Sequence, residues 1–393
     1  MREIIKAKVE KGGRITSEEA YWLLTEADIL DLAPLAQTVR LRHNPREMVT
    51  FVVDTNLNYT NVCDAFCTFC AFYRRPGDKD AYTYTVEQMV ERIGEAIKKG
   101  VTTVLLQGGL NSDLPLEYYE NLVRSSYAAY PQLHAHFFSA PEVQKMSQVS
   151  GLPVSAVIAR LKAAGLKSIP GGGSEVLADR VKRRVSKLFP KGKVADWIEV
   201  HREAHKAGIR TTATMMYGHL DTDEDIIEHL GHVRDLQDET GGFTAFIPWS
   251  FSKGNTALSK RVKEEAGPNK YLRVIAVSRL FLDNVQHIQA SWFSEGKKTG
   301  QVALHFGGDD FGGTLFDENV MLASGFYNRT TVDEVVAMIK EAGFVPAQRT
   351  TLYEVLTVFD EPLKRQVRIP LASGQAARWY FGHSGHVESI SSK

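Results

Sequence analysis

The sequence has only three cysteines among its 393 residues, and all three lie between Cys63 and Cys70. Since no cysteine is left elsewhere for a disulfide framework, the composition argues against a disulfide-stapled secreted protein and favours a reducing compartment. No apolar stretch approaches the ~20 residues that a membrane-spanning helix requires. The first residues alternate in charge and lack the apolar core of a signal peptide. We therefore expect a cytoplasmic protein with no membrane partner.

The sequence also has no excess charge of either sign, because 47 Lys and Arg residues balance 47 Asp and Glu residues. A neutral chain exerts no long-range attraction on nucleic acid or on an anionic membrane, so neither is expected as a partner. Its content of 43% hydrophobic and 24% charged residues is that of an ordinary globular protein. A small-molecule substrate is the expected partner.

Short apolar segments alternate along the chain with segments of helical period. The strand candidates are 51–55, 103–107, 133–138, 166–169, 210–216, 243–247, 287–290 and 302–306. Helices with a 3.6-residue period are expected between most of them, at 86–99, 116–130 and 223–237. This alternation predicts an α/β fold with parallel strands joined by right-handed crossovers. Eight such strands predict a (β/α)8 TIM-type barrel.

Three parts of the chain are expected around this barrel. Residues 1–48 form an N-terminal helical preface, in which Thr16 and Glu19 have capping-box spacing. Residues 49–328 form the barrel itself. Residues 329–393 form a C-terminal extension, with a helix at 332–342 followed by a tail without clear period. The link 291–301 between the last two strands is too short and too rich in Gly and Lys for a full helix, which leaves room for a distorted barrel there.

The three cysteines have the spacing C-x3-C-x2-C, at Cys63, Cys67 and Cys70. Three thiolates on one tight loop can each reach a different iron of a [4Fe–4S] cubane, which usually takes four thiolates. Since the chain has no fourth cysteine, one iron should stay open to a ligand from outside the protein. The loop directly follows the first strand candidate, so it belongs at the catalytic, C-terminal mouth of the barrel.

Other interpretations of the three cysteines exist. A zinc site would need a fourth ligand from a nearby His or Asp, and this spacing is not usual for zinc. An electron-transfer ferredoxin would normally be small and have four cysteines. Three unrelated buried cysteines could also fall into this spacing by chance. We favour the cluster over each of these.

Glycines follow two of the predicted strands at the mouth. Gly108 and Gly109 come after the second strand, where glycine lets backbone groups approach a ligand closely, although a plain turn is the alternative. The segment 170–175 comes after the fourth strand and ends in Glu175. Three glycines before an acidic residue suit close contact with a ribose or an amino acid, but many loops are rich in glycine.

Polar and aromatic residues follow the later strands. His219 could be a proton carrier, and a hydrogen-bonded structural histidine is equally consistent with its position. Trp249 could stack on a planar ligand or simply fill the mouth. Asp309 and Asp310 follow the eighth strand candidate. His134 and His136 share one face of the third strand, where we prefer a hydrogen-bonding role to a second metal.

From Ile15 to about Leu356 the chain resembles the radical S-adenosylmethionine (SAM) enzymes of the futalosine route to menaquinone. The aminofutalosine synthases and the deazaflavin (F0) synthase subunits are similar over much of this length. The resemblance is carried by Asn58–Tyr73, 105–110 (LLQGGL), 168–175 (SIPGGGSE), 211–219 (TTATMMYGH), 237–249 (QDETGGFTAFIPW) and 289–292 (QASW).

The resemblance implies a cofactor set and a reaction. A [4Fe–4S] cluster on the three cysteines would bind SAM at its fourth iron, and an external one-electron reductant such as flavodoxin or ferredoxin would reduce it. SAM cleavage would give a 5′-deoxyadenosyl radical. That radical would abstract hydrogen from ribose C4′ of dehypoxanthine futalosine, and the carbon radical would add to the benzoate ring. Aminofutalosine synthesis, F0 synthesis and a non-catalytic iron–sulfur electron carrier are the alternatives.

The resemblance also implies roles for residues that follow the predicted strands. Gly108 and Gly109 would meet the SAM amino group, Glu175 would meet its ribose or amino end, and backbone around Phe69 and Phe72 would flank the adenine. The candidate bases are Glu175, His219, Asp309 and Asp310. Arg74, Arg75 and Arg210 are candidates for the substrate carboxylate, for which arginine is well suited.

Overall fold

The fold is that of a computed structural model, which describes residues 1–44, 47–186, 192–316, 318–327 and 329–359. It also describes the backbone of three C-terminal strands, β12 (Gln366–Pro370), β13 (Ala376–Phe381) and β14 (Val387–Ser389), which pair as an antiparallel sheet. The rest of the predicted C-terminal tail lies outside the described residues. No helix in the described part is both long and apolar enough to cross a membrane.

Seven parallel strands form the main sheet, in their order along the chain. They are β2 (Asp54–Leu57), β3 (Thr103–Leu106), β4 (His134–Phe137), β5 (Ser168–Ile169), β6 (Arg210–Tyr217), β7 (Phe243–Ser250) and β8 (His287–Ile288). A second sheet has the order β11-β10-β1-β9. Its strands are β1 (Met48–Val52), β9 (Asp310–Gly313), β10 (Val345–Arg349) and β11 (Val355–Val358). Since β1 runs into β2 through Val53, the two sheets share one bent first strand.

Backbone bonds around β9 close the ring of strands. The amide of Ala290 donates to the carbonyl of Asp310 at 2.8 Å, and the amide of Asp309 donates to Ile288 at 3.1 Å, which joins β8 to β9. On its other side β9 pairs in parallel with β1, where Thr50 lies opposite Asp310. The predicted (β/α)8 barrel, distorted at this closing strand, is therefore confirmed.

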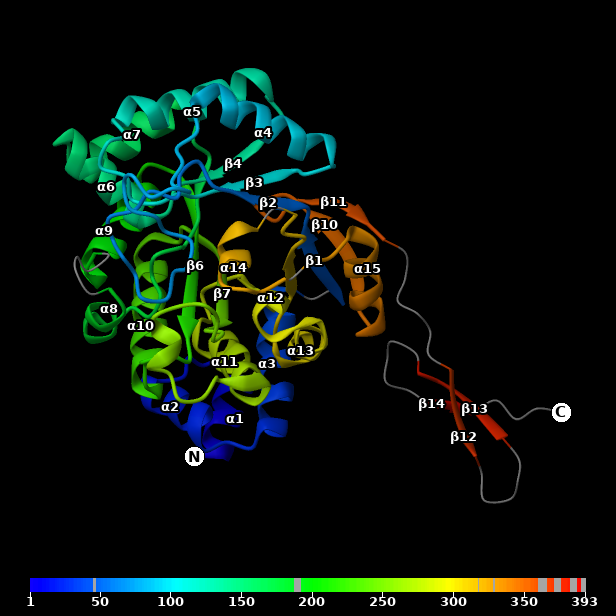
Figure 1. The fold of residues 1–393 in the computed structure, drawn as a ribbon. Coiled ribbons are helices and arrows are strands. Elements are labelled where there is room, and N and C mark those ends of the chain that lie inside the picture. Colours follow the sequence, from blue (N-terminus) through cyan, green and yellow to red (C-terminus); the bar gives the residue numbers. More distant parts are fainter. Residues whose placement is uncertain are drawn as a thin grey trace.

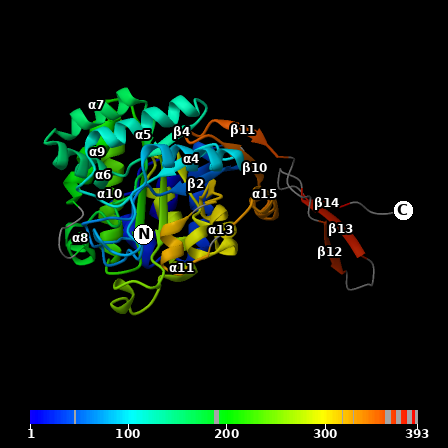
Figure 2. The same ribbon diagram turned by 45° about the horizontal axis from the view of Figure 1, so that its top comes forward.

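Helices surround the strands on the outside (Figures 1 and 2). The predicted helix at 86–99 is formed, and it begins with a capping box of Thr85 and Gln88 and ends just before Gly100. The outer helices are α4 (Val86–Lys98), α5 (Leu116–Ala129), α6 (Ala140–Ser150), α7 (Val154–Ala164), α8 (Asp179–Val185), α9 (Val194–Lys206), α10 (Asp223–Thr240) and α11 (Gly267–Phe281).

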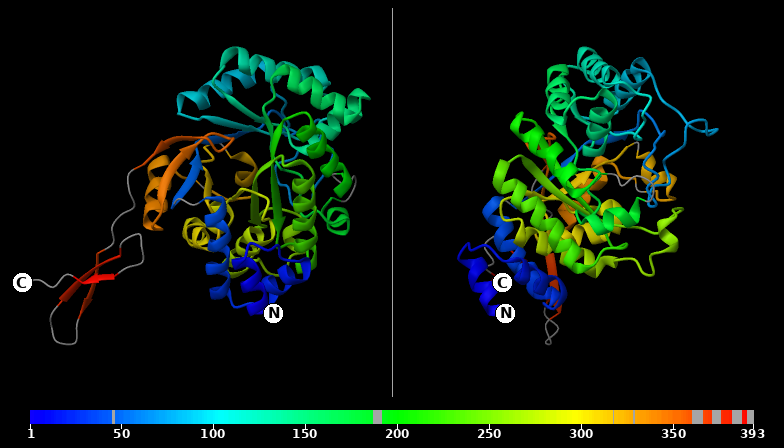
Figure 3. Two further views of the ribbon diagram at one scale, coloured as in Figure 1. Left: turned by 180° about the vertical axis from the view of Figure 1, so that it is seen from behind. Right: turned by 90° about the vertical axis from the view of Figure 1, so that its left-hand side faces the viewer.

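The N-terminal preface consists of α1 (Arg2–Glu10), α2 (Ser17–Thr25) and α3 (Ile29–His43). The Thr16 side chain accepts from the amide of Glu19, and the Glu19 carboxylate accepts from the amide of Thr16, as the spacing predicts. In Figure 3 these helices lie against one side of the barrel, where α2 contacts α10 and α11, and α3 contacts α11.

The predicted strand at 302–306 is wrong. These residues form the end of α13 (Lys297–Ala303) and the short helix η2 (Leu304–Phe306), and the eighth strand is β9 instead. A five-residue apolar run does not distinguish a strand from a buried helical turn, and here the helix buries Ala303, Leu304 and Phe306. The link before it is broken, as expected, into α12 (Trp292–Glu295) and α13, at Gly296 with φ of 87°.

The C-terminal extension takes part in the barrel. After α14 (Asn319–Ala323) and α15 (Val332–Glu341), β10 pairs in parallel with β1 along the edge opposite β9. The turn after β10 then enters the N-terminal end of the barrel. The ring of Tyr353 stacks on His287 with centroids 3.7 Å apart, and the hydroxyls of Thr351 and Thr103 lie 2.7 Å apart. This turn is the floor of the barrel. The pairing of β1 with β10 thus joins the part of the chain before residue 328 to the part after it. The division of the chain into 1–48, 49–328 and 329–393 stays a prediction.

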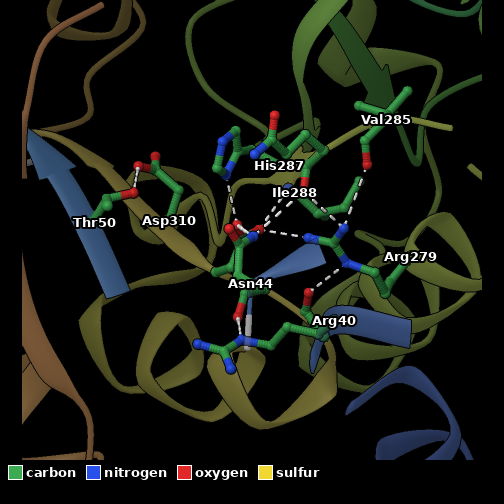
Figure 4. A network of polar contacts seen from close by, with 12 residues as sticks. Arg40, Asn44, Thr50, Arg279, Val285, His287, Ile288 and Asp310 are labelled. Carbon is green, nitrogen blue, oxygen red and sulfur yellow. Dashed lines mark hydrogen bonds and ion pairs between the residues drawn. The ribbon is translucent and has the colours of Figure 1, made fainter. Parts of the chain in front are cut away.

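A buried network around Asp309 fixes the start of β9, where the seventh crossover of the barrel ends. Figure 4 labels four of its members, Asn44, Arg279, His287 and Ile288. Arg279, Asn44 and the amide of Ile288 all donate to the Asp309 carboxylate, and His287 Nδ1 lies 2.7 Å from it. Burial raises the pKa of this carboxyl, but the charges of Arg279 and His287 outweigh it and bring the pKa to about 2. Asp309 is therefore ionised whenever the protein is folded at ordinary pH.

Asp309→Asn should destabilise the fold strongly. It leaves the fully buried guanidinium of Arg279 without a counter-charge, and removing one partner of a buried ion pair costs about 3–5 kcal/mol. Urea denaturation at neutral pH should show a fall of that size in the free energy of unfolding. Asp235→Asn, on the exposed side of α10, is the matched control and should change it by less than about 0.5 kcal/mol. Equal stability of the two variants would contradict the role of Asp309.

Candidate active site

The three cysteines lie on the loop that follows β2. None of the three forms a disulfide, and they share one small apolar cluster with Ala65 and Leu110. The loop is closed at its base, because the amide of Cys63 donates to Arg74 at 3.0 Å and the amide of Arg74 donates back to Asn61 at 2.7 Å. The loop therefore presents its thiols from a fixed base at the mouth of the barrel.

The three cysteines are the candidate ligands of a metal cluster. A cubane takes each thiolate at a different iron, whereas a zinc ion needs four ligands that converge on one point. In the ranges that the structure describes, no three His, Cys, Asp or Glu side chains form such a convergent group.

A tight glycine turn supports the cysteine loop from below. The amide of Gly109 donates to Thr60 at 3.0 Å, and a Cβ added to Gly109 would lie 2.1 Å from the carbonyl oxygen of Val62 and 2.9 Å from Cys63 Cβ. Only glycine allows this approach. The two glycines thus let the cysteine loop pack against the end of β3, a reason that the sequence did not reveal.

The buried carboxylate of Glu142 holds the same turn. Its Oε1 accepts from the amide of Gly108 at 3.0 Å and from the hydroxyl of Tyr59 at 2.7 Å, and its Oε2 accepts from the amide of Ser139 at 2.7 Å. Burial raises the pKa of Glu142, and the Ser139 bonds oppose that rise. Glu142 positions the loop from the start of α6 without facing the cavity.

A cavity of about 300 Å³ extends along the inside of the barrel. Alternate residues of the strands line it, including Thr212, Thr214 and Met216 on β6, because successive side chains of a strand point to opposite faces. At the mouth it is bounded by aromatic side chains such as Phe69, and at the floor by Tyr353. The cavity therefore extends from Phe69, beside the cysteine loop, to Tyr353 at the floor of the barrel.

Some of the predicted site residues line this cavity. They are Phe69, Glu175 and Trp249. Glu175 has the left-handed φ of 41° and is buried, with its Oε2 3.7 Å from the ammonium of Lys182. Phe72, Gly108 and Gly109 are not among the lining residues, and the ring of Phe72 packs instead on Tyr82.

His219 does not line the cavity. Its Nδ1 accepts from the amide of Leu220 at 2.6 Å, and its Nε2 donates to the carbonyl of Met216 at 2.9 Å. A ring with one accepting and one donating nitrogen is neutral, and burial lowers the pKa of His219. The structural interpretation of this histidine holds, and the proton-carrier interpretation does not fit its geometry.

Asp309 and Asp310 lie at the wrong end of the barrel for a catalytic base. Because the eighth strand is β9, they begin it rather than follow it. Asp310 is fully buried and accepts from Arg349 Nε at 2.5 Å and Nη2 at 2.9 Å. Both aspartates are therefore structural counter-ions near the floor, and the error follows directly from the misassigned strand.

The arginines expected near the substrate carboxylate are also occupied elsewhere. Arg74 Nη1 donates to the carbonyls of 71, 72 and 73 at 3.1, 3.2 and 2.9 Å, which stabilises the end of the cysteine loop. Arg75 lies over the ring of Phe66, and Arg210 donates to Gly241 at the start of β6. None of these three arginines is a lining residue of the cavity.

His134 and His136 share a hydrogen-bonding role, as preferred. His134 Nε2 and His136 Nδ1 lie 2.8 and 2.7 Å from the hydroxyl of Ser168. Burial lowers the pKa of His136 to about 3, so its ring is neutral on the cavity wall.

Sequence reasoning missed four polar residues of the cavity wall: Asp54, Asn56, Glu318 and Arg349. Asp54 and Asn56 are inward-facing residues of β2, and a carboxylate within an apolar strand was the available signal. The amide of Leu315 donates to Asp54 Oδ1 at 2.9 Å, and burial raises the pKa of Asp54 to about 6. Nothing in the sequence linked Glu318 or Arg349 to this strand.

Comparison with known proteins agrees with this geometry. Residues 57–233 match the radical SAM superfamily, and residues 240–361 match the CofH/MqnC C-terminal region. The FeFe-hydrogenase maturase HydG from Carboxydothermus hydrogenoformans superposes with a TM-score of 0.71 at 18% identity, over 90% of this chain and 80% of that one. Methylornithine synthase (PylB) superposes with a TM-score of 0.62 at 19% identity, over 87% of this chain and 97% of that one. These two structural similarities support the barrel fold and nothing further.

Relatives of higher sequence identity are named for three different activities. The cyclic dehypoxanthine futalosine synthase of Halalkalibacterium halodurans is 40% identical over 91% of this chain and 95% of its own. The 5-amino-6-(D-ribitylamino)uracil–L-tyrosine 4-hydroxyphenyl transferase of Methanopyrus kandleri is 41% identical over 82% and 90%. The aminodeoxyfutalosine synthase of Streptomyces coelicolor is 34% identical over 94% and 98%.

A parallel barrel with three closely spaced cysteines on the loop after its first strand is the arrangement expected of an enzyme that holds an iron–sulfur cluster at the barrel mouth. The chain belongs to the radical SAM superfamily, in the group that has the CofH/MqnC C-terminal region. Membership implies a [4Fe–4S] cluster and SAM as cofactors and a small-molecule substrate.

The raised pKa of Asp54 predicts a pH-dependent stability. An unfolded aspartate has a pKa of about 3.9, and the folded value is about 6. The stabilising contribution of the protonated carboxyl is therefore complete below pH ~4 and is lost as the pH rises through about 6. Asparagine cannot ionise, so the stability of Asp54→Asn relative to wild type should rise by about 2–3 kcal/mol between those limits. Urea denaturation of both proteins over this pH range measures the two free energies of unfolding. Parallel curves of free energy against pH would refute the prediction.

Proposed function

We propose that this chain is a radical SAM cyclase that converts dehypoxanthine futalosine into cyclic dehypoxanthinyl futalosine in menaquinone biosynthesis. The supporting observation is that two cyclic dehypoxanthine futalosine synthases, from Halalkalibacterium halodurans and Streptomyces coelicolor, are each 40% identical over more than nine-tenths of this chain. The aminodeoxyfutalosine synthase is 34% identical over a similar length.

A second candidate is the deazaflavin-forming reaction of the F0 synthase subunit. It is favoured by the 41% identity to the tyrosine 4-hydroxyphenyl transferase of Methanopyrus kandleri. The transferase of the same name from Methanosarcina acetivorans is 40% identical over 92% of this chain, so identity and coverage do not separate the two candidates, and the choice between them is left to the experiment below. A non-catalytic electron carrier has no comparable support.

In this proposal Cys63, Cys67 and Cys70 hold the cluster and its fourth iron binds SAM. When bound and reduced by an external one-electron donor such as flavodoxin or ferredoxin, this pair supplies a carbon radical that abstracts hydrogen. Gly108 and Gly109 would approach the SAM amino group, and Glu175 would meet its ribose or amino end. The backbone around Phe69 and Phe72 would flank the adenine. The reaction would take place in the cytoplasm, where thiols stay reduced.

The chain's own residues exclude water and handle the proton. Phe69 and Trp249 bound the mouth, and Tyr353 seals the floor, so a reactive intermediate would be shielded from solvent. Restoring the aromatic ring after the radical has added to the benzoate would release one proton, which needs a base, and one electron, which would return to the oxidised iron–sulfur cluster. Of the candidates made from the sequence, only Glu175 lines the cavity, and Asp54 joins it as a carboxyl with a pKa of about 6. Leu315 holds Asp54 Oδ1, which leaves Oδ2 to receive the proton.

The deciding experiment is anaerobic. The protein is reconstituted with iron and sulfide, reduced with dithionite, and given SAM with dehypoxanthine futalosine. The proposal expects 5′-deoxyadenosine and a product lighter than the substrate by two hydrogen atoms, detected by mass spectrometry. If 5′-deoxyadenosine forms only with tyrosine and 5-amino-6-(D-ribitylamino)uracil, the second candidate is correct. No 5′-deoxyadenosine with any substrate, despite an intact cluster, would overturn both.

Loss of any one of the three thiolates should abolish SAM cleavage. Cys63→Ala, Cys67→Ala and Cys70→Ala each remove one ligand of a site that has no fourth cysteine in reserve. The measurement is 5′-deoxyadenosine formed per protein under reducing conditions. Full turnover by any of the three variants would contradict the cluster assignment.

Gly109→Ala should impair cluster binding without touching a cysteine. The added methyl group would meet the backbone of Val62 at 2.1 Å, so the cysteine loop must shift. We expect iron and sulfide content after reconstitution to fall several-fold. Gly231→Ala is the matched control, because nothing lies within 4 Å of its Cβ position and α10 favours alanine over glycine. Equal iron content in the two variants would show that the turn does not position the loop.

A further inference from the structure

One wall of the cavity consists of hydrogen-bond acceptors. Asp54 and Asn56 stand on the inward face of β2, and Glu318 faces the same cavity from the segment just before α14. Most of the remaining wall is apolar or made of threonine and glycine, including Thr212, Thr214 and the glycines at 171–173. A ligand that matches this wall must bring donors, since carboxylates and amide oxygens accept hydrogen bonds.

Asn56 has a buried acceptor without a partner. Its side-chain Nδ2 donates to Glu318 Oε1 at 3.1 Å, which fixes the orientation of the amide because a carboxylate can only accept. Its Oδ1 is buried and has no hydrogen-bond partner among the described residues. The residue is 8% exposed. Leaving such an atom unpaired is costly, so its presence beside a cavity points to a donor on the ligand.

Glu318 is held in place by the start of α14. Its Oε1 accepts from Asn56 and from the amide of Val320 at 3.2 Å, and its Oε2 accepts from the amide of Met321 at 2.5 Å. The amide of Leu322 also bonds this carboxylate. These backbone bonds keep the carboxylate rigid, so Glu318 fixes the amide of Asn56 and leaves Asn56 Oδ1 as the acceptor available to a ligand.

The position of this pair along β2 matters. Asn56 lies two residues closer to the mouth than Asp54, on the strand that leads to the cysteine loop. The radical chemistry of the proposed function begins at that mouth. A sugar bound at Asn56 would therefore lie nearer the cysteines than a ring bound beside Asp54 and the floor.

We propose that Asn56 Oδ1, oriented by Glu318, binds a sugar hydroxyl of the substrate and holds the sugar at the mouth side of the cavity. This rests on the proposed function for the identity of the sugar, which there is the ribose of dehypoxanthine futalosine. The chemistry recognised is a polyol, and the ribityl chain of 5-amino-6-(D-ribitylamino)uracil offers the same donors.

The test measures binding rather than turnover. Reconstituted but unreduced protein with SAM is titrated by anaerobic equilibrium dialysis with dehypoxanthine futalosine and with its 2′-deoxy and 3′-deoxy analogues. Wild type should bind at least one deoxy analogue about tenfold more weakly, the typical effect of one hydrogen bond at a buried acceptor. Asn56→Leu should bind the parent about tenfold more weakly and lose this discrimination. Asn121→Leu, an exposed position on α5, should behave as wild type.

The outcomes separate this inference from the proposed function. Equal affinity of wild type for the parent and both analogues would overturn the hydroxyl site even if the cyclase reaction proceeds. If the parent does not bind but the ribitylaminouracil does, the proposed function fails. The site is then supported by weaker binding of that ligand to Asn56→Leu and refuted by equal binding. If Asn56→Leu does not fold, Glu318→Gln and the wild-type analogue series still decide the question.

Discussion

Two neighbouring aspartates close this barrel, and each depends on a buried arginine. Asp309 is compensated by Arg279 from α11, and Asp310 by Arg349 from β10. The strand that begins at Asp310 is the only one that joins β8 to β1 in the described part of the chain. The electrostatic balance of four buried charges thus determines whether the sheet becomes a ring, and the cavity exists only inside a closed ring.

The same closure sets the polarity of the cavity. Charged pairs lie at the end where Asp309 and Asp310 begin their strand, and the thiols lie at the end where β2 leads into its loop. Between the two ends, β2 presents acceptors while β6 presents threonine and methionine. A substrate entering at the cysteine loop therefore meets a polar wall and an apolar wall at once, which orients it before any reaction.

Much of this could be predicted because it depends on local pattern. The alternation of strands and helices predicted the barrel, and the capping-box spacing at Thr16 predicted the start of a helix. The order of segments placed the cysteine loop directly after the first strand. The failures came where tertiary contacts decide. The apolar run 302–306 could be helix or strand, and that one error moved Asp309 and Asp310 to the opposite end of the barrel. Arg349 and Glu318 could not be placed, because only the folded chain brings them to β2.

The pairing of β10 with β1 has a consequence for how the chain matures. Met48 lies opposite Val345, so the first strand of the barrel is synthesised long before the partner that completes its edge. Non-local pairing of this kind is slow and leaves intermediates with an unpaired strand edge. During that interval the cysteine loop is already made while the Tyr353 end of the cavity is still open. A nascent chain would thus have a tunnel through its barrel, which becomes a blind chamber only when β10 and the turn with Tyr353 dock.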